Sequence, residues 1–231
     1  RTVFFMQGCP LRCAYCHNPD SQTMFSKNRI TPEEVLKTAK RYKSYYKRSN
    51  GGVTFSGGES LIQGEFLLES LKLLKKGGIN TCLDTSGYGQ EEYYKEILEY
   101  TDVVILDIKQ FSHKEYKNLT GKSMNGFYTF LSYLNDFKGK IWIRHVMVPG
   151  FTDNEESMYK LFNNISHLCE KIERIEILPF HKMGIDKYEK LGRDYKLKNV
   201  PEMDLNKAKK YEEILSLLLE KEKIRVQKSI I

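Results

Sequence analysis

Short β-rich runs alternate with longer helical runs along this chain of 231 residues. Runs rich in Val, Ile, Phe or Thr predict strands. They are Thr2–Met6, Gly52–Ser56, Ile79–Asp84, Asp102–Asp107, Lys140–Val148 and Arg174–Pro179. Strands joined through a helix normally lie parallel, with a right-handed crossover. The alternation therefore predicts one α/β domain around a parallel sheet, and neither an internal repeat nor a low-complexity linker divides the chain.

Helix signals fill the intervals between these strands. Thr31 as N-cap, Pro32 in the first turn and the capping-box acid Glu34 predict a helix that runs to about Arg48. Apolar residues at helical spacing predict a second helix, Gln63 to Lys76, which stops before two glycines. The same reasoning predicts helices over residues 91–100, 126–137, 154–171 and 205–221, followed by a short terminal strand, Ile224 to Gln227.

An open doubly wound sheet and a barrel both fit parallel β/α units. A closed eightfold barrel takes about 250 residues, whereas only six crossover strands are visible here, so a six-unit, incompletely closed barrel fits the count. Polar or unusual residues accompany the successive strands. Cys9–Asp20, Gly57–Glu59 and His181 follow a strand, Asp84–Gly87 and Asp107–Lys109 end one, and Arg144 lies within the fifth. Since barrel enzymes gather their chemistry at these strand ends, we expect the functional site there.

Composition excludes several classes of protein. The hydrophobic fraction of 40% is too high for a disordered chain. The longest apolar runs, such as Val103–Leu106, fall far short of the roughly 20 residues of a membrane span. The net charge is +7, and the sequence contains no run of five Lys or Arg residues. This distribution favours a solubilising surface or a face for an acidic protein partner over nucleic acid binding. Because Arg1 is no initiator methionine, we expect a segment before it.

Three of the five cysteines, Cys9, Cys13 and Cys16, stand at C-x3-C-x2-C spacing in one loop. An odd number of cysteines, three of them close together, argues against a framework of disulfides. It indicates a metal site in a protein of a reducing compartment. Three thiolates leave one iron of a cubane iron–sulfur cluster open to an outside ligand. A structural zinc site that adds His17 to the three cysteines is the alternative. The remaining two cysteines, Cys82 and Cys169, have apolar neighbours and are predicted to pack in the core.

This loop, with Tyr15 before its third cysteine, resembles the signature of the radical S-adenosylmethionine (SAM) enzymes, and within them the activating enzymes of glycyl radical enzymes. Further segments similar to that family are Tyr15–Asn18, Gly51–Thr54, Ser56–Glu59, Thr81–Thr85, Leu106–Gln110, Trp142–Arg144, Val148–Gly150 and Ile177–His181. The likeness spans nearly the whole chain. It implies a single radical SAM domain over residues 1–231, folded as a partial (β/α)6 barrel with parallel strands.

The resemblance implies one 4Fe-4S cluster held by Cys9, Cys13 and Cys16, with SAM on the fourth iron. It implies SAM contacts from Tyr15, Cys16, His17, Asn18, Gly57, Gly58, Glu59, Asp84, Thr85, Asp107, Ile108, Lys109, Arg144 and His181. In that reading the two glycines admit the ligand closely, and Glu59 accepts a hydrogen bond from the SAM ammonium. Arg144 pairs with a carboxylate, His181 meets the ribose, and a monovalent cation lies near Asp84.

The implied reaction is that of an oxidoreductase. The reduced cluster cleaves SAM to methionine and a 5′-deoxyadenosyl radical, which takes a hydrogen from a glycine of a partner glycyl radical enzyme, without a protein acid or base. The other implied partner is a flavodoxin- or ferredoxin-like electron donor, and the implied location is the cytoplasm. Pro19 to Gly51 contains no cysteine, which excludes a second cluster there and favours a compact branch of the family. The alternatives are another compact radical SAM enzyme acting on a small molecule or peptide, and a Cys3His zinc-binding interaction module.

Overall fold

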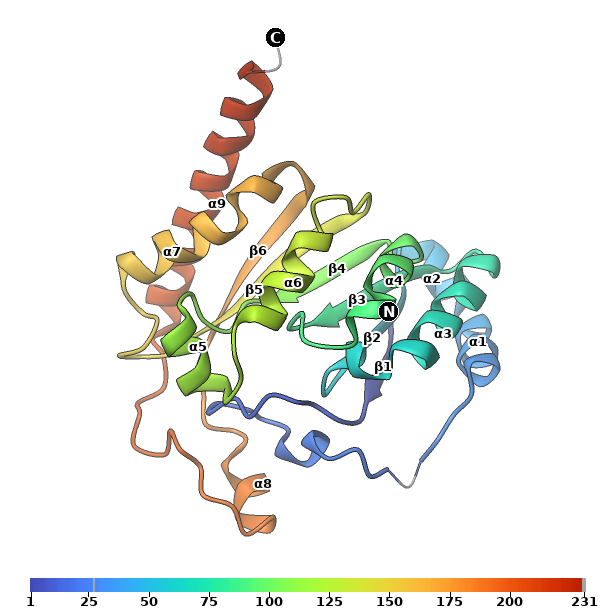
Figure 1. Ribbon diagram of the computed structural model, residues 1–231, viewed down its shortest axis with the longest axis horizontal. Helices are drawn as coiled ribbons and strands as arrows, with labels where there is room; N and C mark the ends of the chain where they lie inside the picture. Colours follow the sequence, from blue (N-terminus) through green and yellow to red (C-terminus); the bar gives the residue numbers. More distant parts are fainter. Residues whose placement is uncertain (27, 230–231) are drawn as a thin grey trace. The chain divides into compact units, whose positions relative to one another are not determined.

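The computed structural model describes residues 1–26 and 28–229 of the chain (Figure 1). The chain divides into two compact units. Unit 1 consists of Arg1–Leu11, Asp20–Leu106 and Asn125–Lys140, and unit 2 consists of Arg12–Pro19, Asp107–Met124 and Ile141–Ile231. The single domain over residues 1–231 stays a prediction.

The strands form one six-stranded sheet in the order β1-β2-β3-β4-β5-β6. Their bounds are β1 (Thr2–Met6), β2 (Gly52–Gly57), β3 (Asn80–Thr85), β4 (Val103–Asp107), β5 (Lys140–Met147) and β6 (Ile172–Pro179). The registered pairs are parallel: Phe4 lies opposite Phe55, and Leu83 opposite Val104. In the described part of the chain the sheet is open, with β1 and β6 at its edges. The predicted parallel, incompletely closed α/β architecture is therefore confirmed.

Unit 1 packs helices against the strands β1 to β4. These are α1 (Pro32–Arg41), α2 (Lys43–Ser49), α3 (Gly64–Lys76), α4 (Tyr94–Glu99) and α6 (Asn125–Tyr133), with 3₁₀ turns η2 (Ser60–Gln63) and η3 (Glu91–Tyr93). The capping box at Thr31 and Glu34 is present as predicted. The helix predicted to reach Arg48 is divided at Tyr42, whose φ of −102° and ψ of 10° end one helix and begin the next. Helix α3 contacts α1, α4 and β3. Its leucines Leu67, Leu71 and Leu74 are fully buried and belong to the core of this unit.

Unit 2 contains α5 (His113–Thr120), α7 (Glu155–Ile165), the 3₁₀ turn η4 (Ser166–Lys171), α8 (Ile185–Lys190) and α9 (Leu205–Ser229). Helix α9 packs on β6, η4 and α7. The predicted strand Ile224–Gln227 is wrong, because these residues continue α9. Ion pairs one turn apart, Lys223–Glu220 and Arg225–Glu222, support the helix and outweigh the strand propensity of Ile and Val.

The short helices α5 and α8 have no counterpart in the sequence predictions. Helix α5 is capped by Ser112, whose side chain accepts a hydrogen bond from the Glu115 amide, and it ends at Gly121 with φ of 76°. Both signals are present in the sequence. Eight residues between them give too short an apolar pattern to predict a helix.

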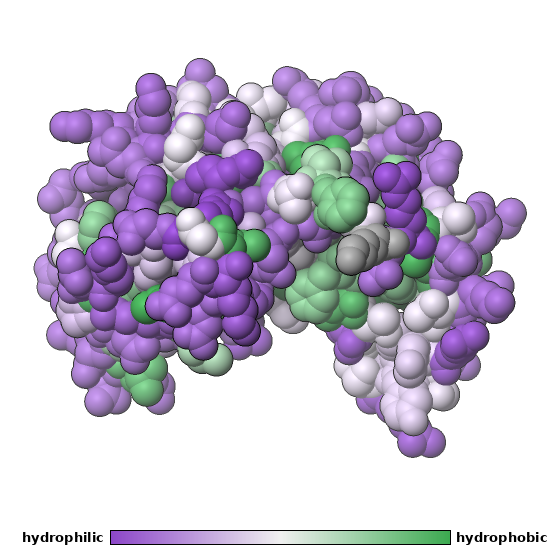
Figure 2. All heavy atoms as spheres, turned by 90° about the horizontal axis from the view of Figure 1, so that it is seen from below, coloured by the Kyte–Doolittle hydropathy of each residue, from purple (hydrophilic) through white to green (hydrophobic). Residues whose placement is uncertain are grey.

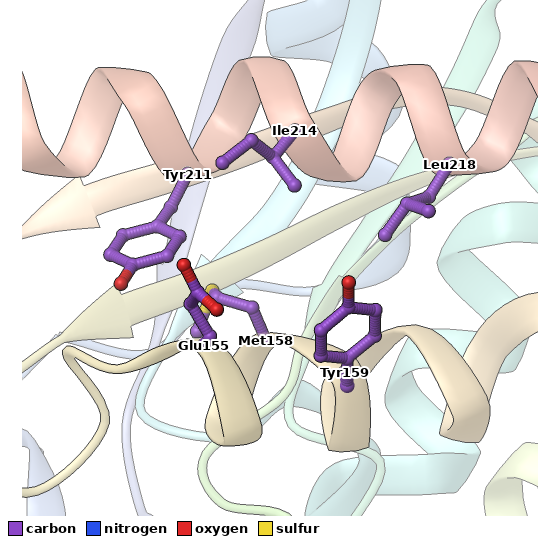
Figure 3. Close-up of a pocket in the computed structure, with 6 residues that line it drawn as sticks. All are labelled: Glu155, Met158, Tyr159, Tyr211, Ile214 and Leu218. Atoms are coloured by element: carbon purple, nitrogen blue, oxygen red, sulfur yellow. The ribbon is translucent and has the colours of Figure 1, made fainter.

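The surface turned to the viewer in Figure 2 is mainly hydrophilic, as the charged composition leads us to expect. Among the described residues, no helix combines the length and the apolar character that crossing a membrane requires. All five cysteines are thiols, and Cys82 and Cys169 are 1% and 2% exposed. These last two thiols pack in the core, as predicted.

Candidate functional site

Cys13 and Cys16 of unit 2 lie at the two ends of one tight turn. The Cys16 amide donates to the Cys13 carbonyl over 3.0 Å. The end of α5 holds the turn, since the Arg12 amide donates to the Thr120 carbonyl at 2.7 Å and the Ala14 amide donates to the Leu119 carbonyl at 2.9 Å. Helix α5, which the sequence did not predict, is therefore the support on which these two thiols are presented.

Cys9 belongs to unit 1 and is half-buried. The preceding Gly8 has φ of +95°, a backbone conformation that residues with a Cβ rarely adopt, so the start of the loop favours glycine. The Gly8 amide donates to the Ser21 carbonyl over 2.8 Å, which anchors the start of the loop. Within residues 1–26 and 28–229, no three His, Cys, Asp or Glu side chains already converge on a common metal position. The ligand set Cys9, Cys13 and Cys16 thus stays a prediction.

The glycines at the end of β2 lie directly on the backbone of the first loop. A Cβ on Gly57, whose φ is +111°, would lie 2.4 Å from the Met6 nitrogen, and one on Gly58 would lie 2.1 Å from the Gly8 carbonyl oxygen. The Gly58 amide donates to the Met6 carbonyl and the Glu59 amide to the Gly8 carbonyl, each at 2.8 Å. The chain's own backbone therefore requires both glycines. Their approach to a ligand stays a prediction.

Glu59 is only 2% exposed, yet its carboxylate is fully hydrogen-bonded inside unit 1. Oε1 accepts from the Thr85 hydroxyl at 2.6 Å and the Leu61 amide at 3.1 Å. Oε2 accepts from the Ser86 amide at 2.8 Å and the Ser86 hydroxyl at 2.6 Å. Burial raises the pKa of Glu59, and these hydrogen bonds oppose the rise. A carboxylate can accept about four hydrogen bonds, and these donors fill all the acceptor positions of Glu59. The network ties the end of β2 to the end of β3.

Asp84 and Thr85 end β3 beside this network. The Ser56 hydroxyl donates to Asp84 Oδ2 over 2.8 Å, which joins β2 to β3 a second time. Ser86, which donates twice to Glu59, was not singled out as a site residue. The polar run after the strand was its only signal, because sequence does not reveal which carboxylate such a hydroxyl will meet. The cation near Asp84 and the bond from the SAM ammonium to Glu59 both stay predictions.

Tyr15, Asp107 and Lys109 of unit 2 form one cluster. Lys109 Nζ lies 2.7 Å from Asp107 Oδ2, with side chains 15% and 16% exposed, and 5.7 Å from the centre of the Tyr15 ring. Burial alone would lower the pKa of Lys109, but the carboxylate of Asp107 outweighs it, so the pKa lies well above its usual value. Burial also raises the pKa of Tyr15 well above normal, against the opposing effect of Lys109. The cluster thus holds a lysine cation and a neutral phenol.

Several buried polar atoms of unit 2 have no hydrogen-bond partner among the described residues, and three of them belong to predicted site residues. Tyr15 Oη, Asp107 Oδ1 and His181 Nδ1 are buried, and none has a hydrogen-bond partner among the described residues. Buried polar atoms are normally paired, so each such exception calls for an explanation. A phenol, a carboxylate oxygen and an imidazole nitrogen suit a ligand that carries both donors and acceptors.

The segment around α8 lies on the cysteine loop within unit 2. The rings of His17 and His181 are 4.2 Å apart, and His17 Nε2 donates to the His181 carbonyl at 2.9 Å. Burial lowers the pKa of His17, which that hydrogen bond partly offsets. Lys187 Nζ donates to Asn18 Oδ1 over 2.6 Å, and a Cβ on Gly184 would lie 2.9 Å from the His17 Cα. In the sequence, the glycine at position 184 is the local feature that is consistent with this close packing on His17.

Arg144 of β5 pairs with a carboxylate of the neighbouring strand. Its Nε donates to Glu176 Oε2 at 3.2 Å, and Arg174 donates to the other oxygen of Glu176 at 3.0 Å. The predicted pairing of Arg144 with a ligand carboxylate is untested. Ile108, a further predicted contact, is fully buried, and its amide donates to the Arg144 carbonyl at 2.8 Å. A ligand would therefore meet its immediate neighbours Asp107 and Lys109 more readily than the Ile108 side chain.

The chain belongs to the radical SAM superfamily, whose family model matches residues 3–162. Within it, the chain is 52% identical over 220 residues to the pyruvate formate-lyase-activating enzyme of Clostridium pasteurianum, covering 95% of this chain and 92% of that protein. It is 41% identical over 211 residues to the enzyme of the same name from Staphylococcus epidermidis, covering 88% and 84%. The sequence resemblance, which was closest to the pyruvate formate-lyase branch, is confirmed.

A solved structure supports the fold. A domain of pyruvate-formate lyase-activating enzyme from Bacteroides vulgatus superposes with a TM-score of 0.58 at 20% identity, covering 72% of this chain and 93% of that domain. At this identity the likeness shows the fold alone. It agrees with the open, parallel six-stranded sheet.

Proposed function

We propose that this chain is a radical SAM activase that generates the glycyl radical of pyruvate formate-lyase. One observation carries the proposal: identity of 52% over 95% of the chain to an enzyme of that name. The cysteine loop supports it, because all three cysteines of the C-x3-C-x2-C pattern are present as thiols.

Cys9, Cys13 and Cys16 would hold three irons of one 4Fe-4S cluster. When bound and reduced, the cluster supplies the electron that cleaves SAM into methionine and the radical fragment that takes a hydrogen from the partner's glycine. The protein's own work is to bind, orient and exclude water. Helix α5 fixes the backbone on both sides of Cys13, so these thiols are held before any metal arrives.

Three of the unsatisfied atoms of unit 2 are the proposed ligand contacts. Asp107 Oδ1 can accept from the ligand, Tyr15 Oη can donate or accept, and His181 Nδ1 can contact a ribose hydroxyl. Lys109 stays charged because Asp107 is 2.7 Å away. Through their backbone or ring edges, His17 and Asn18 would complete this set beside Cys16, and Arg144 would add a further cation.

Unit 1 would contribute to the site mainly by fixing the backbone of the loops beside Cys9. Gly57 and Gly58 bring their loop onto the backbone that precedes Cys9, and Glu59 fixes that loop to Thr85 and Ser86. Asp84, with one oxygen bonded to Ser56, is the proposed neighbour of a monovalent cation that offsets two anionic groups. A cytoplasmic location, a role in anaerobic glucose metabolism and a flavodoxin- or ferredoxin-like electron donor complete the proposal.

The experiment is anaerobic reconstitution followed by reduction with SAM and pyruvate formate-lyase. We expect iron and acid-labile sulfide near four per chain, SAM cleavage, and a glycyl signal in electron paramagnetic resonance. A colourless zinc protein that cleaves no SAM would overturn the proposal in favour of a zinc-binding module. SAM cleavage without a glycyl signal on this partner would point to another radical SAM enzyme. A partner whose acceptor glycine is replaced by alanine serves as the control.

A further inference from the structure

His145 is a fully buried histidine in β5 that the predicted site does not include. Its Nδ1 lies 2.7 Å from the Ile108 carbonyl oxygen. A carbonyl only accepts hydrogen bonds, so Nδ1 must carry the proton. In the neutral ring Nε2 is then an acceptor, and Nε2 is buried with no partner among the described residues. The ring therefore satisfies one backbone carbonyl and leaves its own second nitrogen unpaired.

The carbonyl that His145 holds belongs to the residue between Asp107 and Lys109. The Ile108 amide donates to the Arg144 carbonyl at 2.8 Å, so both backbone polar groups of Ile108 are bound to two consecutive residues of β5. Strand β4 ends at Asp107, and Ile108 lies just beyond the regular ladder. This fixed peptide sets the direction in which the side chains of Asp107 and Lys109 leave the backbone.

His145 also supports the segment that leads from β4 to α5. Its ring centroid lies 4.9 Å from that of Phe111, which is buried. The Phe111 amide donates to the Gln110 side chain over 2.7 Å, so this connection is internally braced. Helix α5 follows directly and holds the backbone around Cys13. The His145 ring thus packs on the segment that joins the Asp107–Lys109 pair to α5, the helix that supports the cysteine turn.

We infer that His145 is a positioning residue of the SAM site, which acts by donating from Nδ1 to the Ile108 carbonyl and so orienting Asp107 and Lys109. A residue needed only for packing would be apolar, since an unpaired imidazole nitrogen is costly in the core. The inference rests on the proposed function, because the site it serves is the proposed SAM site. The effect on the backbone is independent of that function.

Two variants separate the hydrogen bond from the packing. In His145→Asn the side-chain amide nitrogen replaces Nδ1 at the same number of bonds from the backbone, while most of the ring is lost. In His145→Phe the ring remains and the donor is lost, which leaves the Ile108 carbonyl unpaired. Met147→Leu, at a fully buried site of the same strand, is the control for a core change of conserved volume.

The first measurement is hydrogen exchange of the protein without cluster or SAM, followed by mass spectrometry of peptides that cover residues 107–112. We expect exchange there to rise about tenfold in His145→Phe and to stay within about threefold of wild type in His145→Asn. The Met147→Leu control should leave this segment unchanged. Equal exchange in all four proteins would overturn the inference, and so would a rise across the whole sheet in both His145 variants.

The second measurement is SAM affinity and SAM cleavage by the reconstituted protein. We expect KM for SAM to rise about tenfold in His145→Phe with a smaller change in kcat, and His145→Asn to restore it despite its smaller side chain. Wild-type KM in His145→Phe would overturn the inference. If wild type itself binds no SAM, the proposed function fails, while the exchange result still decides the backbone role of His145.

Discussion

Glu59 in unit 1 and Tyr15 in unit 2 are both buried polar side chains near the predicted site, and their surroundings differ sharply. Glu59 accepts hydrogen bonds from three residues, so both carboxylate oxygens are occupied. The Tyr15 hydroxyl has no partner among the described residues. The same contrast separates Thr85, which donates to Glu59, from Asp107, whose Oδ1 is unpaired. Around the predicted site, the buried carboxylate of unit 1 thus holds loops together, whereas two buried polar groups of unit 2 keep an unpaired atom.

This contrast has a physical consequence. Removing a satisfied buried group leaves its former partners unpaired, which destabilises the fold by the full desolvation cost of each partner. Removing an unpaired buried group leaves nothing behind and relieves a cost already present. Variants of unit 1 should therefore lose stability first, whereas variants of unit 2 should lose ligand affinity first.

The largest effect is expected for Cys16→Ser, which removes a proposed iron ligand from the turn that α5 supports. We expect loss of the cluster absorbance, a large loss of iron, and no detectable SAM cleavage, because a serine oxygen is a poor replacement for a thiolate on iron. Iron and sulfide assays with visible absorbance measure this. Cys169→Ala, at a thiol 2% exposed in η4, is the matched control and should keep the cluster. Equal cluster loss in both variants would contradict the assignment.

The next largest effect is expected for Glu59→Gln. The new amide group places donors against the donors of Thr85 and Leu61 or against those of Ser86, so the network breaks on one side. We expect the free energy of unfolding to fall by about 2–4 kcal/mol, measured by urea unfolding. Unchanged stability would show that the network does not hold unit 1 together, and the contrast between the units would fail.

The free energy of unfolding should depend on pH with opposite signs for one buried group of each unit, His145 in unit 2 and Glu59 in unit 1. Burial lowers the pKa of His145 to about 4 from 6.5, so the unfolded chain binds more protons between these values and stability falls as pH drops through this window. At most this contributes about 3 kcal/mol. Burial raises the pKa of Glu59, so its contribution instead declines as pH rises above the unfolded value of 4.5.

Unfolding free energies of wild type and His145→Phe between pH 4 and pH 7 measure the first of these effects. The variant should show a flatter dependence on pH, with a residual slope from His17 and His167, whose pKa values are also lowered by burial. Parallel curves for the two proteins would contradict the buried, neutral state of His145.

A smaller effect is expected for Tyr15→Phe. Because the Tyr15 hydroxyl has no partner, its removal should leave stability unchanged or raise it by up to about 1 kcal/mol. SAM affinity should fall about fivefold if this hydroxyl bonds the ligand, measured by equilibrium binding to the reconstituted protein. Lower stability together with unchanged SAM affinity would reverse the contrast with Glu59.

The smallest effect concerns the electron donor. Lys190 and Lys196 are exposed in the segment of unit 2 that packs on the cysteine loop. Reversing both to Glu should slow cluster reduction by an acidic flavodoxin a few-fold at low salt and not at high salt, measured by stopped-flow absorbance. The same double reversal at Lys37 and Lys40 of α1 is the control, with an equal change in net charge. Equal slowing in both would show a general charge effect.

Local signals explain what the sequence alone determined. All six strands and the capping box at Thr31 were predicted, because strand propensity and helix capping act within a few residues. The radical SAM family was also readable, since Cys9, Cys13 and Cys16 stand close together in one loop. Such local patterns can be recognised without knowing which residues far apart in the chain are in contact.

The tertiary structure decided how each buried polar group is used. The sequence predicts Glu59 as a ligand contact, which stays a prediction. Only the fold reveals that Leu61, Thr85 and Ser86 donate to its two oxygens. His145 reads as one more residue of a strand, until the fold brings the Ile108 carbonyl to its Nδ1. Hydrogen-bond satisfaction depends on groups far apart in the chain, so only the folded structure determines which polar side chains are already paired and which are not.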